Sequence, residues 1–547
     1  MSAEHETQVT SPELDVVVVG AGFAGIYLLH RLRQQGLTVQ IFEAGSGVGG
    51  TWFWNRYPGA RCDVESLDYQ YSFSPELLRD WRWSERYPRQ DELLKYLNFV
   101  TDRFELRDGI ELDTRVTSTV FDETANRWSV ETDTGKHVTA KFVVMAVGCL
   151  STAKLPDFTG LDSFQGDWYH TGSWPHEDVD FTGKRVAVIG TGSSGIQAIP
   201  AVAEQANEVV VFQRTANYSV PAFNGPLAEE TVESVISNFD DRRKATRESF
   251  LGLAVPSNEQ SALAVSEEER RTEYEARWNM GGLPMYGAFA DILLDSAAND
   301  TAVEFFESKI RAKVTDPAVA DLLIPKGYPF GGKRICVDTN YFETFNRDNV
   351  TLVDVKDTPI ERITPTGIIV DGHEYEVDII VFATGFDAMT GSILKIDVRG
   401  REGESLTQKW SEGPRTYLGL ATAGFPNLFI VTGPGSPSVF SNMVVSIEQH
   451  VDWIADALAH LGAHDLEVIE ATRAAENEWV DHVNLVADST LMPGANSWYQ
   501  GANIPGKPRV FMPYLGGVGA YRQKCDEVAA GGYEGFDLES SLSVSQA

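Results

Sequence analysis

The sequence has 547 residues, too many for one ordinary hydrophobic core, so we expect two or three packed units. Its content of 43% hydrophobic and 23% charged residues excludes a disordered chain, and no uncharged apolar run is long enough to span a bilayer. The formal net charge of -34 opposes binding to nucleic acid and to anionic lipid surfaces.

The N-terminal segment and the cysteines indicate the compartment. The first residues, MSAEHETQVTSPELD, lack the basic start and the apolar stretch of a signal peptide, which predicts a cytoplasmic protein. The cysteines at positions 62, 149, 336 and 525 lie far apart and show neither metal-ligand nor redox spacing. This pattern favours a reducing compartment and argues against a metal site.

The segment LDVVVVGAGFAGIYLLHRLRQQGLTVQIFEAG predicts a buried strand over residues 15–19, a tight turn, a helix and a second strand. In its G-x-G-x-x-G motif, Gly20 allows the turn, Gly22 lets the backbone approach a pyrophosphate, and Gly25 lets helix and strand pack closely. Glu43 ends the second strand, where it can accept hydrogen bonds from ribose hydroxyls and disfavour a 2'-phosphate. This first site is predicted to hold FAD or NAD.

Residues 47–66, GVGGTWFWNRYPGARCDVES, add a second glycine loop and a dense aromatic and basic patch. Such a loop could cover the flat ring of a flavin, with Gly50, Thr51 and Trp52 as cofactor contacts, although the aromatic residues could equally be core. Two later segments, residues 140–151 and 377–388, are buried strands that end in small residues, where the backbone either runs close to a ligand or simply belongs to the core.

The dinucleotide motif occurs a second time. A strand over residues 185–189 leads into Gly190, Gly192 and Gly195, then a helix, then a strand over residues 208–212. This second strand ends in Arg214 and Thr215, a cation and a hydroxyl suited to the 2'-phosphate of NADP. Two unlike strand ends therefore predict two unlike dinucleotides.

These elements predict an α/β fold with two Rossmann-like dinucleotide-binding domains, for FAD and NADP, and an inserted helical region. We expect residues 1–150 and 387–547 to form the FAD-binding domain, the second part carrying C-terminal helices. Residues 151–224 and 331–386 are assigned to the NADP-binding domain. The charged residues 225–330 are assigned to the helical insertion.

Between the two motifs lies FQGDWYHTGSWP, residues 164–175, which has no strand or helix period. Here the chain resembles the type I Baeyer-Villiger monooxygenases, whose signature F-x-G-x-x-x-H-x-x-x-W is present as Phe164, Gly166, His170 and Trp174. Six further segments occur in the family's order, namely GAGFAG, GGTWFWNRYPGARCDVES, GTGSSG, FGGKR, ATGFD and GANSWYQGANIPGKPR. Within the family the chain looks most like the phenylacetone and steroid monooxygenases, particularly in FQRTANYSVP and GPGSPS. The resemblance implies an enzyme that uses FAD, NADPH and O2 to convert ketones into esters or lactones through a flavin peroxide.

The resemblance also assigns roles to residues. Arg334 in FGGKR is implied to stabilise the peroxide and the developing alkoxide, and Asp63 to orient that arginine. Lys333 is implied to contact the NADP 2'-phosphate, and Trp498 to close over the bound nicotinamide cofactor.

His170 is interpreted as a linker residue that couples the two nucleotide domains rather than as a general acid or base. Gly166 and Gly172 are expected to give the linker backbone freedom, and Trp168 and Trp174 to anchor it.

The substrate pocket of the related enzymes maps to five mostly apolar positions, which are Leu150, Ser438, Val439, Phe440 and Met443. The expected partners are a small-molecule ketone and O2, without nucleic acid or membrane. A monomer is compatible with the sequence, which does not define the oligomeric state.

Three alternatives stay open at this point. A flavin-containing monooxygenase that oxidises nitrogen or sulfur shares both glycine motifs and a similar linker. A disulfide reductase shares the architecture but needs a nearby cysteine pair. A non-catalytic nucleotide sensor would bind no flavin.

Overall fold

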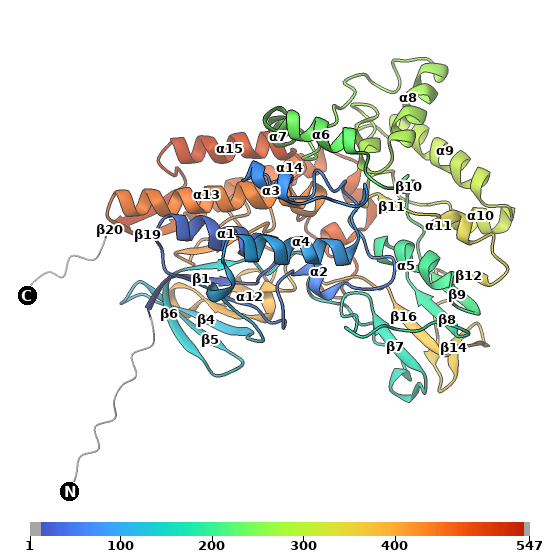
Figure 1. Cartoon of the computed structure of the whole chain (residues 1–547), viewed down its shortest axis with the longest axis horizontal. Coiled ribbons are helices and arrows are strands. Elements are labelled where there is room, and N and C mark those ends of the chain that lie inside the picture. The colour runs from blue at the N-terminus through green and yellow to red at the C-terminus, as the bar shows by residue number, and fades with distance from the viewer. Residues whose placement is uncertain (1–12, 541–547) are drawn as a thin grey trace, which may run out of the picture.

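Two sheets of mainly parallel strands organise the chain, and each is built around one of the two glycine turns (Figure 1). The computed structural model describes residues 13–540. The predicted α/β class with two dinucleotide-binding units is confirmed. The lack of a signal-peptide pattern was inferred from residues 1–15, of which residues 1–12 lie outside the described residues.

The first sheet contains the N-terminal glycine motif. In spatial order its strands are β17 (Asp397–Arg399), β4 (Val116–Asp122), β5 (Arg127–Thr132), β6 (His137–Met145), β1 (Glu13–Val19), β2 (Val39–Phe42) and β3 (Ile110–Glu111), with β18 (Leu428–Ile430) beside β6. β1 is parallel to both β2 and β6, and its residues Val16, Val17 and Val18 are fully buried. Helices α1 (Phe23–Gln34) and α13 (Met443–Ala463) pack together, and their core includes Val16 and Val18. Val17 and Val19 belong to a second core that includes Trp128 and Leu406, so both faces of β1 are covered, which explains why the strand is continuously apolar.

The second sheet is entirely parallel. Its strands in spatial order are β12 (Val350–Asp354), β9 (Glu208–Gln213), β8 (Arg185–Ile189), β16 (Ile379–Phe382) and β7 (Asp167–His170). A small antiparallel sheet of β13 (Arg362–Ile363), β14 (Gly367–Val370) and β15 (His373–Glu376) packs its apolar residues against the second sheet.

Residues 164–175 show no strand period, yet β7 lies in their middle and pairs with β16 as the edge of the second sheet. The glycines there also act differently from the prediction. A Cβ on Gly166 would lie 2.2 Å from Asp378 O, and one on Gly172 would lie 2.5 Å from the Phe386 ring, so both allow close packing rather than freedom. Trp174 is buried as expected, whereas Trp168 is 42% exposed.

The helical insertion leaves and re-enters the second unit through a two-stranded parallel pair, β10 (Ser219–Pro221) and β11 (Cys336–Asp338). Its helices are α6 (Glu229–Ser237), α7 (Phe239–Glu248), α8 (Glu267–Met280), α9 (Ser296–Lys313) and α10 (Pro317–Leu323). α6 and α7 pack on α3 (Pro75–Asp80) and α15 (Val518–Ala530), whereas α9 packs on α11 (Tyr341–Thr344). The insertion therefore contacts both units.

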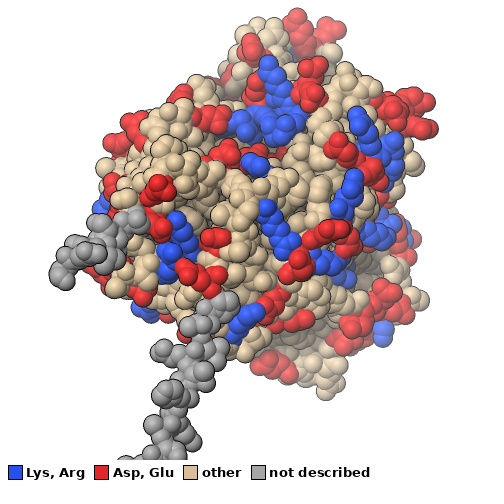
Figure 2. All heavy atoms as spheres, turned by 60° about the vertical axis from the view of Figure 1, so that its left-hand side comes forward, with Lys and Arg blue, Asp and Glu red and all other residues tan. Residues whose placement is uncertain are grey.

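The remaining elements complete the layers around the sheets. They are α2 (Thr51–Trp54), α4 (Gln90–Arg103), α5 (Ser193–Ala203), α12 (Leu406–Lys409), β19 (Leu466–Ala471), α14 (Arg473–Asp488) and β20 (Phe536–Ser540). Within residues 13–540, no helix combines the length and apolar character needed to cross a membrane. On the face shown in Figure 2, acidic and basic side chains lie interspersed, so many basic groups there have acidic neighbours.

Candidate functional site

One large cavity of about 1310 Å³ lies between the two sheets and is lined by both glycine motifs. At the first motif, Gly20 has φ +104°, and a Cβ there would lie 2.7 Å from Ala146 O, so the turn requires glycine. Gly190 repeats this geometry at the second motif, with φ +109° and Ala383 O at 2.5 Å from such a Cβ. Each turn thus fits against the strand that returns to its sheet, as the repeated motif predicts.

Glu43 lies at the end of β2 and is only 5% exposed. Its Oε2 accepts a hydrogen bond from Ala21 N and its Oε1 accepts one from Gly45 N, both at 2.7 Å. Burial raises the pKa of this carboxyl group, and the backbone donors oppose that rise. Glu43 therefore joins the first glycine turn to the following loop, a role that the sequence did not suggest, and it also lines the cavity.

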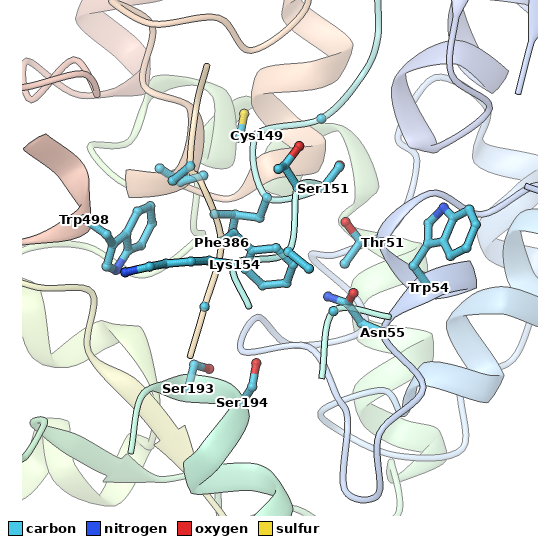
Figure 3. A pocket seen from close by; sticks show the side chains of 18 of the residues that line it. Thr51, Trp54, Asn55, Cys149, Ser151, Lys154, Ser193, Ser194, Phe386 and Trp498 are labelled. Carbon is cyan, nitrogen blue, oxygen red and sulfur yellow. The ribbon is translucent and has the colours of Figure 1, made fainter. Parts of the chain in front are cut away.

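The second glycine loop lies against the first motif, where Gly49 N donates to Ala21 O at 2.9 Å. Gly50 and Thr51 line the cavity at the start of α2, and a Cβ on Gly22 would lie 3.5 Å from Gly50 Cα. Trp52 also lines it while remaining 7% exposed. Figure 3 shows Thr51 on one side of the cavity and Trp498 on the other. Gly25 does not line the cavity, because its role is to let α1 start against the turn.

Positive charge gathers at the second motif. Arg214, Thr215 and Lys333 all line the cavity beside Gly190 and Gly192, whereas Gly195 is buried in α5. Burial, followed by the charge of Arg214, lowers the pKa of Lys333 to about 8. An anion placed between these two cations would relieve their repulsion.

Lys154 is a third cation here, and the sequence prediction missed it. Burial and then the charge of Arg214 lower the pKa of Lys154, which lies nine residues after the end of β6. Its side chain extends toward Trp498 in Figure 3. The signal available in the sequence was a lysine soon after a strand that ends in small residues.

Arg334 and Asp63 form a bidentate pair at the cavity wall. Arg334 Nε donates to Asp63 Oδ2 at 2.6 Å and Nη2 donates to Oδ1 at 3.0 Å, while Nη1 donates to Val439 O at 2.8 Å. Burial alone would lower the pKa of Arg334, but the charge and hydrogen bonds of Asp63 outweigh burial and raise it. A guanidinium has five N–H donors, so two are left without a partner in the described part of the chain.

His170 lies outside the cavity wall, at the end of β7, and is 5% exposed. Its Nδ1 accepts from Gly172 N at 3.0 Å, so Nε2 carries the proton and lies 3.1 Å from Lys154 O and 3.2 Å from Thr384 Oγ1. Burial lowers the pKa of this imidazole. The side chain therefore contacts both segments that connect the two sheets. Phe164, Gly166 and Trp174 likewise lie away from the cavity wall.

Three of the five predicted substrate-pocket residues, Leu150, Val439 and Met443, line the cavity. Ser438 and Phe440 do not, which corrects the prediction. Ser438 adopts φ 42° in the short 3-10 turn Ser438–Phe440, and its hydroxyl donates to Thr432 O at 3.1 Å. This turn directs both side chains into the core behind the wall, where each is at most 1% exposed.

The fold and the site define an oxidoreductase with two dinucleotide-binding units. The first unit has the Glu43 carboxylate at its strand end, and the second has the cations Arg214 and Lys333 beside its glycine turn. Residues 17–248 match the family model described as pyridine nucleotide-disulphide oxidoreductase. The four cysteines are buried and unpaired, so the chain lacks the disulfide that such a reductase needs.

Full-length relatives identify the family. The chain is 44% identical over 533 residues to a Baeyer-Villiger monooxygenase of Pseudooceanicola batsensis, covering 97% of each protein. It is also 44% identical over 533 residues to the phenazine N-monooxygenase PhzNO1 of Lysobacter antibioticus, covering 97% of this chain and 98% of that relative. The solved structure of an oxidised steroid monooxygenase bound to NADP matches with a TM-score of 0.93 and 57% identity, covering 97% of this chain and 100% of that one.

The chain belongs to the Baeyer-Villiger monooxygenase family. It is a flavoprotein monooxygenase that uses FAD, NADPH and O2 to convert ketones into esters or lactones. The predicted family, activity and cofactors are thereby confirmed.

Proposed function

We propose that Arg334, held by Asp63, stabilises the negative charge that develops on the substrate's carbonyl oxygen during oxygen insertion. The observation that carries this proposal is a bidentate pair at the cavity wall whose guanidinium has two N–H groups with no partner among residues 13–540. Bound FAD, once reduced by NADPH, supplies the chemistry that activates O2. Asp63 fixes the plane of the guanidinium, and the Val439 carbonyl oxygen accepts a hydrogen bond from its Nη1 group.

The residues at each motif fit one of the two cofactors. At the first motif the backbones of Gly22 and Gly50 lie close together, and the Glu43 carboxylate lines the same part of the cavity. This arrangement suits a dinucleotide with a free pair of ribose hydroxyls, so we assign FAD there, with Thr51 and Trp52 beside it. Arg214, Thr215 and Lys333 suit the 2'-phosphate of NADPH, and Trp498 is assigned to cover the nicotinamide end.

These assignments extend to the domains. Residues 1–150 and 387–547 are proposed as the FAD-binding domain, residues 151–224 and 331–386 as the NADPH-binding domain, and residues 225–330 as the insertion. Four buried, unpaired thiols support a location in the reducing cytoplasm.

The substrate is proposed to be a bulky apolar ketone. Leu150, Val439, Met443 and Ile447 give the cavity an apolar wall near Arg334. The relative at 57% identity is named a steroid monooxygenase, which agrees with a wide pocket.

A second candidate activity is oxidation of an aromatic nitrogen, because a relative at 44% identity is named a phenazine N-monooxygenase. Such a reaction develops no alkoxide, so it gives Arg334 less to stabilise. We favour the ketone reaction on that ground.

The test is a product analysis with purified enzyme, NADPH and O2 on a panel of steroid, aryl, cyclic and short linear ketones, with phenazine and a thioether alongside. Esters or lactones from the larger apolar ketones are the expected main products. If N-oxide forms faster than any ester, the second activity replaces the first.

A further inference from the structure

The cavity wall at Trp498 belongs to residues 496–507, called here the tryptophan loop. Trp498 begins the short 3-10 turn Trp498–Gln500, and its neighbour Tyr499 is fully buried. Met512 N donates to Tyr499 O at 3.0 Å, which holds the N-terminal side of the loop to the core. The C-terminal side reaches a different part of the molecule.

Two chain segments connect the sheets, and they pair with each other. Residues 146–154 lead from β6 toward β7, and residues 383–388 lead back from β16. Lys154 N donates to Gly385 O at 3.0 Å, and Asp387 N donates to Thr152 O at 2.9 Å. These paired segments, called here the crossings, are where any rotation of one sheet relative to the other must be accommodated.

The tryptophan loop is attached to both crossings. Lys507 Nζ donates to Asp387 Oδ1 at 2.5 Å and to Ala388 O at 2.8 Å. Asn503 Nδ2 donates to Phe386 O at 2.8 Å, and Lys154 Nζ donates to Asn503 O. The side chains of Lys507 and Asp387 are 11% and 31% exposed, so their ion pair is screened less than a surface pair.

The stem of Lys507 also crosses the loop itself. Gly501 has φ +69°, and a Cβ there would lie 2.9 Å from Lys507 Cδ and 3.0 Å from its Cγ. The lysine therefore closes residues 501–507 into a compact turn before its ammonium group reaches Asp387. Trp498 lies immediately before this turn.

We propose that Lys507 and Asp387 are positioning residues, whose ion pair holds the tryptophan loop on the crossings and so places Trp498 over the cavity. This inference rests on the role proposed above for Trp498. It adds that the position of the indole is set by an ion pair whose two residues lie outside the cavity wall.

The test compares Lys507→Met and Asp387→Asn with Lys507→Arg, which keeps the charge. Lys313→Met is the matched control, because Lys313 at the end of α9 forms a similar ion pair at 2.7 Å with Glu343 of α11, away from the tryptophan loop. Each protein is loaded with FAD and NADP and digested briefly with chymotrypsin, and cleavage after Trp498 and Tyr499 is followed by mass spectrometry. Ester and hydrogen peroxide formed per NADPH are measured separately.

We expect cleavage in the tryptophan loop to accelerate about ten-fold in Lys507→Met and Asp387→Asn, while cleavage elsewhere keeps the wild-type rate. The peroxide share is expected to rise in the same two variants and to return toward wild type in Lys507→Arg. The double variant Lys507→Met with Asp387→Asn is expected to be little worse than either single one.

An unchanged cleavage rate in Lys507→Met would overturn the proposal, as would faster cleavage spread over the whole chain. Gly501→Ala is a second variant, since it displaces the lysine stem without removing a charge, and it is expected to open the same loop. The digestion needs no turnover. A failure of the proposed role of Trp498 is therefore seen separately, as a Trp498→Ala variant with wild-type ester yield.

Discussion

Arg334 and Asp63 are 271 positions apart in the sequence, yet two hydrogen bonds of 2.6 and 3.0 Å join them. The side chains are 16% and 20% exposed, so the pair is largely withdrawn from water. Removing one member of a partly buried ion pair lowers the stability of the fold more than removing both, because the remaining charge then has no partner. The two residues are thus best regarded as one functional unit.

The first prediction concerns this unit. Arg334→Ala is expected to abolish ester formation while FAD stays bound, and NADPH oxidation that continues is expected to yield hydrogen peroxide. Asp63→Ala is expected to behave similarly, since the arginine loses its orientation, and the double variant to be little worse than either. The measurement is ester yield and peroxide yield per NADPH consumed. Ester formation near the wild-type yield in Arg334→Ala would remove the proposed role.

The sequence was sufficient for the parts of the site that are local. Both glycine turns follow from a buried strand, a G-x-G-x-x-G motif and a helix that are contiguous in sequence. Two of the main helices at the C-terminal end, α13 and α14, likewise follow from their apolar period.

What the sequence did not predict depends on contacts between distant segments. β7 is four residues long with no apolar alternation, and it becomes a strand only because β16 offers it an edge. Lys154 meets the tryptophan loop only after both crossings have paired. The orientation of Ser438 depends on a positive φ at a non-glycine residue, which no side-chain pattern signals.

The second prediction concerns cofactor choice. Arg214→Ala is expected to raise the Michaelis constant for NADPH by about ten-fold or more, because a charged hydrogen bond contributes ~1.5–3 kcal/mol. NADH has no 2'-phosphate, so its kinetics are expected to change little. The measurement is steady-state kinetics with both cofactors. An equal loss with NADPH and NADH would make Arg214 a structural residue instead.

The third prediction is a pH dependence. The pKa of Lys333 is lowered to about 8, so the ammonium group is charged below that pH and loses its proton as pH rises through 8. The ratio of the Michaelis constants for NADPH and NADH is therefore expected to increase several-fold between pH 7 and pH 9. Lys333→Arg keeps its charge over this range and is expected to flatten the profile. A wild-type ratio that is constant with pH would contradict the assignment of Lys333 to the phosphate.

The fourth prediction concerns stability. Glu476 is 1% exposed on its side chain and accepts from Lys409 Nζ at 3.0 Å, Thr422 Oγ1 at 2.9 Å and Ala423 N at 2.9 Å. Glu476→Ala leaves the buried lysine without its partner and is expected to cost ~3–5 kcal/mol. The exposed pair of Glu307 and Arg311 serves as a control, with a change within about 0.5 kcal/mol for Glu307→Ala. Thermal unfolding of the holoenzyme measures both.

The last prediction concerns His170, whose Nε2–H contacts Lys154 O and Thr384 Oγ1 while its Nδ1 accepts from Gly172 N. Because the ring is buried and its pKa is lowered, it stays neutral at pH 7, and protonation would place a second proton against the Gly172 N–H. His170→Gln keeps an N–H donor near the Nε2 position, whereas His170→Leu keeps none. We expect His170→Leu to lower ester yield per NADPH several-fold with little change in the Michaelis constant for the ketone, because His170 lies outside the cavity wall. His170→Gln is expected to recover part of that yield. If His170→Leu instead raised the ketone's Michaelis constant at full yield, the side chain would act on substrate binding and not on the connection between the two domains.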